Sequence, residues 1–303
     1  MKILVTGVAG FIGSNLADRL LAVGHEVVGI DNLAYGKKDQ IPQGVDFREL
    51  DIRSKDIYST FEEVEVVFHL AAKNDLIACQ KDPVETMDIN VHGTTNVFEA
   101  ARRAGTKKVV FASSSALEEG EARLKGFYAI SKATCEKLAE GYRAAFGMNY
   151  VLARYFNVYG PRQDYCRVNP PVISSYILKT LKSEAPIFFE GYERDGRDFI
   201  YVDDINDFHL MCLGNEEVNN KIFRLGRGES VPIKEVWEEV KKITNSSLTP
   251  IVKPGPEGHI PVMTRADVSD AVKVGWHAKT PLEDGLRAQF EYLKQEFAKG
   301  NIK

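Results

Sequence analysis

Short apolar runs alternate with longer segments of helical periodicity through the first half of the chain. The runs at 2–6, 26–30, 64–70 and 108–112 are rich in β-branched and aromatic residues, a pattern typical of strands covered on both faces. Another strand is expected at 150–156. Strands alternating with helices predict a parallel α/β sheet with right-handed crossovers.

The helices between these strands are defined by apolar spacing and by their ends. We expect helices at 11–23, 82–104 and 126–146, each followed by a glycine that is typical of a helix end, at Gly24, Gly105 and Gly147. Asp82-Pro83 is a typical helix start. A last helix is expected at about 282–297.

The pattern changes after Gly160-Pro161, where prolines separate shorter elements. We therefore predict an α/β protein with two parts. A doubly wound parallel-sheet domain covers residues 1–165, with 197–213 returning to it. A smaller mixed α/β domain covers residues 166–303 and carries the substrate site.

Composition and charge exclude several classes of protein. The 303 residues carry a formal net charge of −4, so the overall charge does not favour binding to nucleic acid or to an anionic membrane. The four cysteines lack metal-ligand spacing, so no metal site is expected. The first strand follows Met1 directly and no apolar stretch has membrane-spanning length, so we predict a cytoplasmic protein.

A glycine-rich turn joins the first strand to the first helix. Gly7 would allow the tight turn, Gly10 would let backbone amides approach a pyrophosphate, and Gly13 would let the helix pack on the sheet. Phe11 and Ile12 open the helix, whose N-terminus adds partial positive charge. The pattern predicts a dinucleotide site; the alternative is a turn built only for packing.

Acidic residues follow the next two strands. Asp31, with Asn32 beside it, ends the second strand, where a carboxylate bonds ribose hydroxyls and repels a 2′-phosphate, which favours NAD over NADP. Its alternative is a helix-capping aspartate. Asp51-Ile52 follows a third strand. Asp51 is expected to reach the adenine, and a simple turn aspartate is nearly as good an interpretation.

Tyr128 and Lys132 are four residues apart on the 126–146 helix, so they share a face. An ammonium beside a phenol favours phenolate, which can act as a general base near neutral pH. On its own, this four-residue spacing is weak evidence for a catalytic pair, because it occurs often by chance. It gains weight because the preceding strand ends in Ser113-Ser114-Ser115, at the sheet edge where ligands bind. We choose Ser115 as the catalytic serine; capping of the loop is the other use for a serine there.

With these motifs the chain resembles the extended short-chain dehydrogenase/reductase family, and within it nucleotide-sugar epimerases of the UDP-glucose 4-epimerase type. The resemblance covers nearly the whole chain. It rests on Thr6-Gly7-x-x-Gly10-x-x-Gly13, Asp31-Asn32, Asp51-Ile52, His69-Leu70-Ala71-Ala72, Asn90-Val91-x-Gly93-Thr94, Ser113-Ser114-Ser115-Ala116, Tyr128-x-x-x-Lys132, residues 154–162, residues 197–204 and Gly275-Trp276.

The resemblance implies a Rossmann-type sheet, bound NAD, a UDP-sugar substrate and a homodimer formed through 84–104 and 126–146. Further implied NAD-binding residues are Leu70, Ala71, Ala72, Lys73, Asn90, Ser113, Tyr128, Lys132 and Tyr155. Implied substrate-binding residues are Lys73, Ser115, Tyr128, Asn157 and Arg197. Arg197 would bind a phosphate of the sugar nucleotide, because a guanidinium group can form two parallel hydrogen bonds to it. The alternative role for Arg197 is a surface salt bridge.

The implied reaction is C4 epimerisation through a 4-keto sugar, with Tyr128 moving the hydroxyl proton and NAD carrying the hydride. The acid pair that 4,6-dehydratases carry after the catalytic position is replaced by Ala116-Leu117, which disfavours elimination. A reductase would need exchangeable, phosphorylated cofactor, against which Asp31 argues. A non-catalytic NAD-binding regulator is the alternative of another class.

Two segments depart from the family pattern. Leu117-Glu118-Glu119-Gly120 replaces the usual Val-Tyr-Gly, so we expect a more open site mouth and a solvated loop at the two glutamates. Pro256-Glu257-Gly258-His259 stands where the family often has Arg-x-Gly-Asp. The arginine that grips the diphosphate is therefore missing, unless Arg265 or Arg194 replaces it. Met263 is a candidate for the sugar pocket.

Overall fold

The computed structural model describes residues 1–118, 125–255 and 261–302. The chain divides into two compact units. The first unit comprises 1–155, 206–224 and 270–276, and the second unit comprises 156–205, 225–269 and 277–303.

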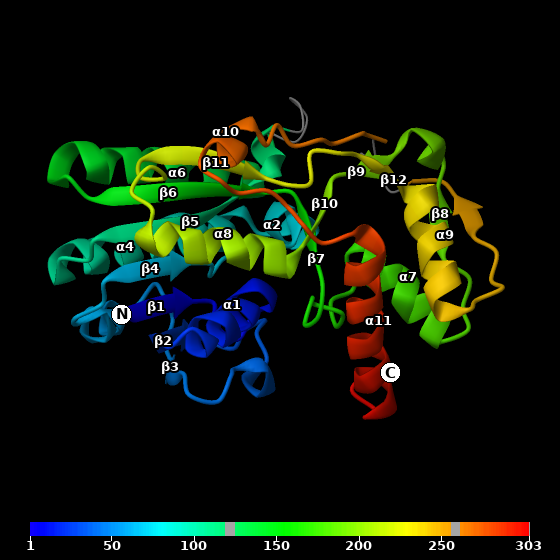
Figure 1. Ribbon diagram of the computed structural model, residues 1–303, viewed down its shortest axis with the longest axis horizontal. Helices are drawn as coiled ribbons and strands as arrows, with labels where there is room; N and C mark the ends of the chain where they lie inside the picture. The colour runs from blue at the N-terminus through cyan, green and yellow to red at the C-terminus, as the bar shows by residue number, and fades with distance from the viewer. Residues whose placement is uncertain (119–124, 256–260, 303) are drawn as a thin grey trace. The chain divides into compact units, whose positions relative to one another are not determined.

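A seven-stranded sheet forms the centre of the described part of the first unit, in the order β11-β6-β5-β4-β1-β2-β3 (Figure 1). Its strands are β1 (Lys2–Thr6), β2 (Glu26–Asp31), β3 (Asp46–Glu49), β4 (Val66–His69), β5 (Lys108–Ser114), β6 (Asn149–Tyr155) and β11 (Lys221–Leu225). The pairings from β3 across to β6 are parallel. The order reverses at β1, between β2 and β4, which is where ligands bind in such sheets.

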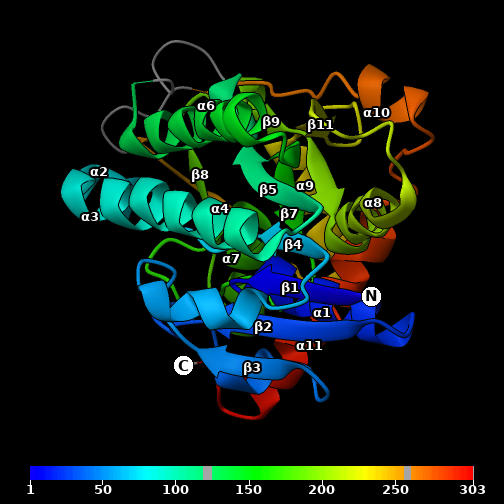
Figure 2. The same cartoon turned by 90° about the vertical axis from the view of Figure 1, so that its left-hand side faces the viewer.

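Helices cover both faces of this sheet. They are α1 (Phe11–Ala22), α2 (Leu76–Lys81), α3 (Pro83–Met87), α4 (Gly93–Ala104), α6 (Phe127–Phe146), α8 (Val202–Gly214) and α10 (Ser269–Lys273). Helices α4 and α6 lie on one face (Figure 2). Helices α1 and α8 lie on the other, where Arg19 and Asp207 form an ion pair of 2.5 Å. The predicted α/β, Rossmann-type doubly wound sheet is thereby confirmed.

The predicted helix ends are confirmed by backbone geometry, since Gly24, Gly105 and Gly147 all have positive φ. The single helix predicted at 82–104 is wrong in one respect. A π-helical turn, η3 (Asp88–His92), separates α3 from α4. Such turns are rare and occur often at functional sites, and this one contains the predicted site residue Asn90.

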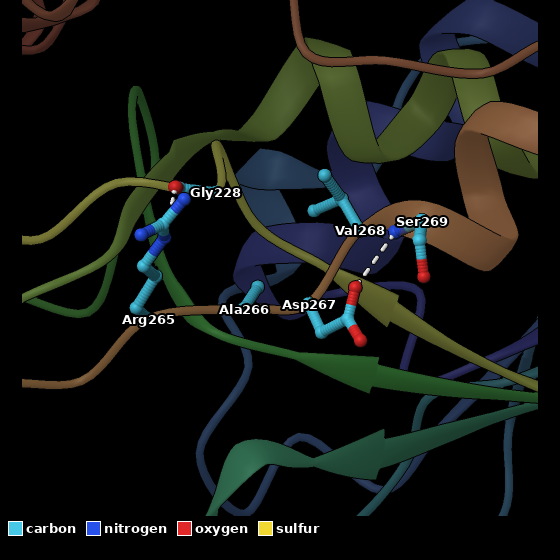
Figure 3. A pocket seen from close by; sticks show the side chains of 6 residues that line it. All are labelled: Gly228, Arg265, Ala266, Asp267, Val268 and Ser269. Carbon is cyan, nitrogen blue, oxygen red and sulfur yellow. Dashed lines mark hydrogen bonds between the residues drawn. The ribbon is translucent and has the colours of Figure 1, made fainter.

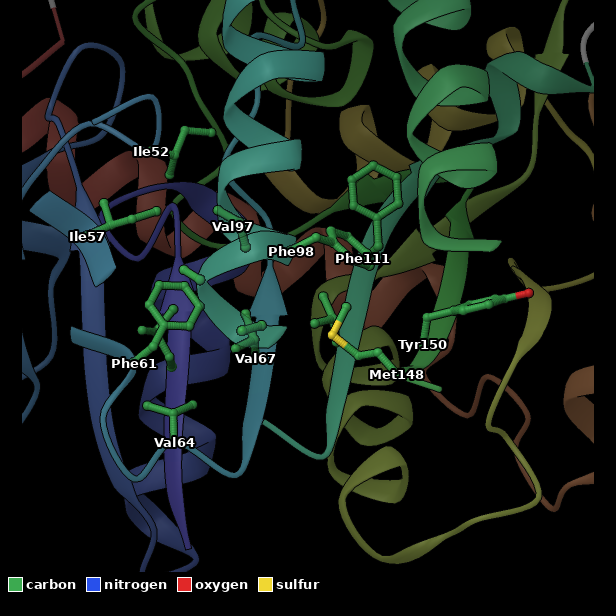
Figure 4. Close-up of a cluster of buried hydrophobic side chains, with 14 of the residues drawn as sticks. Ile52, Ile57, Phe61, Val64, Val67, Val97, Phe98, Phe111, Met148 and Tyr150 are labelled. Atoms are coloured by element: carbon green, nitrogen blue, oxygen red, sulfur yellow. The ribbon is translucent and has the colours of Figure 1, made fainter. Parts of the chain in front are cut away.

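Apolar side chains between the sheet and α4 form the core of the first unit. Phe61, Val67, Phe98 and Phe111 are buried in this cluster (Figure 4). The continuous apolar strands recognised in the sequence supply much of it, because both faces of their strands are covered. This packing makes the sheet a rigid base for the loops at its carboxyl edge.

The second unit has its own core and short strand pairs. Its elements are β7 (Asn157–Tyr159), α7 (Val172–Leu181), β8 (Ile187–Phe189), β9 (Gly196–Arg197), β10 (Phe199–Tyr201), β12 (Val231–Pro232), α9 (Ile233–Thr244), β13 (Ile251–Lys253) and α11 (Leu282–Ala298). Trp237, Tyr176 and Leu286 are buried at the centre. The smaller mixed α/β part expected from the sequence is present, while the boundary at residue 165 stays a prediction.

Candidate active site

Two positions of the glycine-rich turn require glycine for steric reasons. Gly7 has φ +74°, and a Cβ there would lie 2.9 Å from the Ala71 amide nitrogen. A Cβ on Gly13 would lie 2.1 Å from the Gly7 carbonyl oxygen. A side chain at either position would therefore clash with backbone, as the sequence predicted for the tight turn and for the close helix approach.

Gly10 is less tightly constrained than Gly7 and Gly13. The nearest atom to a Cβ at Gly10 is the Gly7 carbonyl oxygen at 3.2 Å. Gly10 is also the N-cap of α1, with no side-chain cap and no acidic residue in the first turn, which starts with Phe11 and Ile12. The exposed amides of an uncapped helix N-terminus suit a phosphate group. This cradle fits the pyrophosphate of a dinucleotide.

Asp31 stands beside this turn at the end of β2. Its carboxylate accepts hydrogen bonds from the amides of Ala9, at 3.0 Å, and Leu33, at 2.8 Å. Burial raises the pKa of Asp31, and the two amides oppose that shift. The carboxylate is fixed next to the phosphate turn, where a ribose would be bound.

Asn32 and Asp51 lie together, although they come from different loops. Asn32 donates from Nδ2 to Asp51 at 2.9 Å. Asp51 also accepts from Arg53 Nε at 2.9 Å and from Nη2 at 2.7 Å, and these bonds lower its pKa well below the usual range. Asp51 is thus held by a side-chain network that includes Arg53, which our sequence reasoning missed. Ile52 is buried in the core.

The loops after β1 and β4 are joined through Thr6. Its hydroxyl oxygen accepts from the amides of Leu70 and Ala71, both at 3.2 Å, and shares a 2.7 Å hydrogen bond with His69 Nδ1. Burial lowers the pKa of His69 to about 3, so this histidine is neutral and structural. Ala72 and Lys73 follow directly at the same sheet edge.

Asn90 connects Lys73 to the predicted catalytic helix. Its Oδ1 accepts from the Lys73 amide at 2.8 Å, and its Nδ2 donates to the Lys73 carbonyl and to Ser131 Oγ, both at 3.0 Å. Ser131 donates in turn to the Tyr128 carbonyl at 2.7 Å. The Lys73 ammonium pairs with Glu85. Asn90 therefore fixes the first turn of α6 against the loop after β4.

The predicted catalytic pair lies on α6. Lys132 Nζ is 5.8 Å from the centre of the Tyr128 ring. It donates to the Ala112 carbonyl at 2.7 Å, and burial lowers its pKa to about 8. Ser115 is buried in the 3-10 turn η4 (Ser115–Leu117) that follows β5. The three residues thus belong to the same unit as the phosphate turn.

Two other predicted NAD-binding residues direct their hydroxyls into the protein. Ser113 donates from Oγ to Glu136 at 2.5 Å. The Tyr155 hydroxyl bonds His209 Nε2 at 2.7 Å, and burial raises the pKa of Tyr155. Any contact of these residues with NAD would have to use other atoms, and that contact stays a prediction.

Glu118 is an exposed residue, as the sequence led us to expect for a solvated loop, but its side chain is held by ion pairs. Its carboxylate accepts from Arg154 Nη1 at 2.7 Å and from Arg224 Nε at 2.8 Å, and 22% of its side chain is exposed. Its neighbour Glu119 lies outside the described residues, and so do Pro256-Glu257-Gly258-His259.

The predicted substrate residues Asn157 and Arg197 belong to the second unit. Asn157 donates from its amide and its side chain to the Asp198 carbonyl, at 3.0 and 3.1 Å. Arg197 pairs with Asp195 and donates to the Val262 carbonyl at 2.6 Å. Its side chain is only 13% exposed, so the ion pair is not the surface salt bridge that we considered.

Asp198 organises this region and was missed as a site residue. Its carboxylate accepts from the amides of Arg227, Gly228 and Ala266, at 2.7, 3.0 and 2.9 Å. Beside it, Gly228 and residues 265–269 line an open pocket (Figure 3). Arg265 donates from Nε to the Gly228 carbonyl at 2.6 Å. The role of Arg265 or Arg194 as a diphosphate ligand stays a prediction.

Within the described ranges, no cluster of histidine, cysteine or acidic side chains could hold a metal ion. No helix among those residues is long and apolar enough to cross a membrane. The site thus consists of a dinucleotide cradle, a Tyr-Lys pair and a buried serine turn.

Comparisons with known proteins agree with this geometry. Residues 3–226 match the model of the NAD dependent epimerase/dehydratase family. The chain is 30% identical to UDP-N-acetyl-alpha-D-glucosaminuronate decarboxylase of Bacillus cytotoxicus, over 97% of this chain and 98% of that protein.

Two solved structures are similar along almost the whole chain. UDP-glucose 4-epimerase of Thermotoga maritima, solved with UDP-glucose, gives a TM-score of 0.92 at 29% identity and covers 98% of this chain and 100% of its own. The Thermus thermophilus UDP-glucose 4-epimerase complex with NAD gives 0.86 at 32% identity, over 97% and 99%. The chain therefore belongs to the NAD-dependent epimerase/dehydratase family, which is part of the extended short-chain dehydrogenases/reductases.

Proposed function

We propose that this enzyme inverts C4 of a UDP-sugar by transient oxidation to the 4-keto sugar. The observation that carries the proposal is the placement of Lys132 Nζ 5.8 Å from the Tyr128 ring, in the unit that holds the phosphate turn. The similarity to UDP-glucose 4-epimerases supports it.

Each residue has a defined task in this proposal. Tyr128 takes the proton of the 4-hydroxyl and later returns it, because the neighbouring ammonium of Lys132 favours the phenolate. Ser115 hydrogen-bonds the reacting oxygen. The glycine turn and Asp31 hold NAD, which when bound accepts the C4 hydride and gives it back. Asn157 and Arg197 bind the sugar diphosphate.

Elimination of the C6 hydroxyl is disfavoured by the chemistry after Ser115. Ala116 and Leu117 complete the 3-10 turn and carry no acid. The next carboxylate, Glu118, is held by two arginines. No acid among the described residues of this turn is therefore placed to move a C5 proton.

A decarboxylase is the second candidate, because the chain resembles the Bacillus cytotoxicus decarboxylase along its full length. Both reactions start with oxidation at C4, so the same Tyr128, Lys132 and Ser115 would serve. A 4-keto uronic acid would then lose its carboxyl group as CO2, and the hydride would return to the 4-keto pentose that remains, whereas an epimerase returns the hydride to the opposite face of the intact sugar.

The test is a screen of UDP-glucose, UDP-N-acetylglucosamine and UDP-glucuronate, with the products followed by NMR. We expect the C4 epimer of at least one sugar at unchanged mass. Release of CO2 from the uronic sugar would favour the decarboxylase instead. Absence of any product, with NAD still bound, would favour the non-catalytic regulator. A homodimer and a cytoplasmic location stay predictions.

A further inference from the structure

The turn that carries Ser115 is short and contains two hydrogen bonds to its own backbone. Ser114 Oγ accepts from the Ala116 amide at 3.1 Å, and the Glu118 amide donates to the Ser115 carbonyl at 2.8 Å. The second bond joins Glu118 directly to Ser115, so the groups that hold Glu118 also bear on the position of Ser115.

Two guanidinium groups hold the Glu118 carboxylate. Arg154 of β6 donates from Nη1 to Oε1 at 2.7 Å, and Arg224 Nε of β11 lies 2.7 and 2.8 Å from the two carboxylate oxygens. The side chains of Glu118, Arg154 and Arg224 are 22%, 16% and 30% exposed. Charge-assisted bonds of this kind are about twice as strong as neutral ones, and partial burial protects them from salt.

Arg154 carries the connection on to the helix of Tyr128. It binds Glu136 bidentately, with Nε at 2.9 Å and Nη2 at 2.6 Å. Glu136 lies eight residues after Tyr128 on α6, close to two helical turns and so on the same face. The serine turn and the tyrosine helix are therefore linked through one arginine.

We propose that Glu118 is a positioning residue that holds Ser115 in place relative to Tyr128. The expected change in kcat rests on the proposed function, because it requires that the enzyme turns over a UDP-sugar. Glu118 acts through the turn and does not touch the reacting atoms.

The kinetic test combines Glu118→Gln with Ser115→Ala. Loss of the charge loosens the turn, so kcat should fall by about 10-fold, because small misplacements of a catalytic group are costly. KM and NAD affinity should stay within about twofold. In the Ser115→Ala background, Glu118→Gln should cause no further loss, since residues that act through one another are not additive.

An equal loss of kcat in both backgrounds, or a loss confined to KM or to NAD affinity, would overturn the proposal. Glu140→Gln is the matched control, because Glu140 also lies on α6 but pairs with the exposed Lys137, at 2.7 Å, away from the serine turn. It should leave kcat unchanged. Arg224→Met, which removes the outer partner of Glu118 alone, should lower kcat in the same direction as Glu118→Gln.

A second readout does not depend on the reaction. In Glu118→Gln the amides of Ala116 and Glu118 should exchange hydrogen about 10-fold faster than in the Glu140→Gln protein. Unchanged exchange would refute the positioning role even if turnover falls. Faster exchange in a protein that converts no UDP-sugar would support the anchor while refuting the proposed function.

Discussion

The phosphate turn of the first unit and the Asp198 region of the second unit are constrained by different means. In the phosphate turn, a Cβ on Gly13 would lie 2.1 Å from the carbonyl oxygen of Gly7, only six residues earlier. Asp198 instead collects amides from Gly228 and Ala266, which are 30 and 68 residues away. Local constraint can be recognised in a sequence, whereas distant hydrogen bonds need the fold.

The largest expected effect is on turnover, in the first unit, which holds both the phosphate turn and Tyr128. Tyr128→Phe should lower turnover by about 10²-fold or more while NAD stays bound, as for loss of a general acid–base. Steady-state kinetics measures the turnover, and the NAD content of the purified protein measures cofactor binding. Tyr142→Phe on the same helix is the control, since its hydroxyl makes only long contacts of 3.4 and 3.5 Å. Near-normal turnover in Tyr128→Phe would remove this residue from the mechanism.

The local constraint is tested by Gly13→Ala. The new methyl group would meet backbone, and overpacking of this kind destabilises by about 1–3 kcal/mol. NAD affinity should also fall, because the helix N-terminus must move. Chemical denaturation and NAD titration measure the two effects. Gly141→Ala on α6 meets nothing within 4 Å and should be neutral or stabilising; similar behaviour of the two variants would contradict the steric account.

The distant constraint is tested by Asp198→Asn. The variant turns an NH2 group toward backbone donors, and unsatisfied buried groups destabilise by about 1–3 kcal/mol. Amide exchange at Gly228 and Ala266 should accelerate. Asp270→Asn, an exposed aspartate paired with Lys273, should change stability little. Protection unchanged at both amides would show that Asp198 does not hold these loops.

The smallest effect concerns Lys132 and pH. Burial lowers its pKa in the folded state from 10.5 to about 8. Above pH 8 the unfolded chain therefore binds more protons at this group, so its contribution to the unfolding free energy rises with pH. Relative to Lys132→Met, the wild type should gain about 1 kcal/mol between pH 8 and 9. Parallel stability curves for the two proteins would mean that the lysine is not buried as described.

Much of the fold could be predicted because its signals are local. Continuous apolar strands, the glycine turn and the helix ends at Gly24, Gly105 and Gly147 all follow from neighbouring residues. The π-turn around Asn90 was not predicted; the side chain of Asn90 bonds Lys73, in the loop after β4, and Ser131, on α6, and both are distant in sequence.

The same distinction applies to the candidate site. The four-residue spacing of Tyr128 and Lys132 was enough to place them on one helix face. The ion pairs of Glu118 were missed because its partners, Arg154 and Arg224, come from strands 36 and 106 residues away. A charged residue in a predicted loop has no visible partner until the sheet brings one to it.

The most direct test of the proposed reaction follows a deuterium atom placed at C4 of the sugar. The protein, with its bound NAD, is incubated with the UDP-sugar that the screen identifies, in ordinary water, and the product is analysed by NMR. We predict inversion at C4 with the deuterium retained at that carbon, because the hydride leaves and returns within one site. Inversion with loss of the label to solvent, or retention of configuration, would contradict the account.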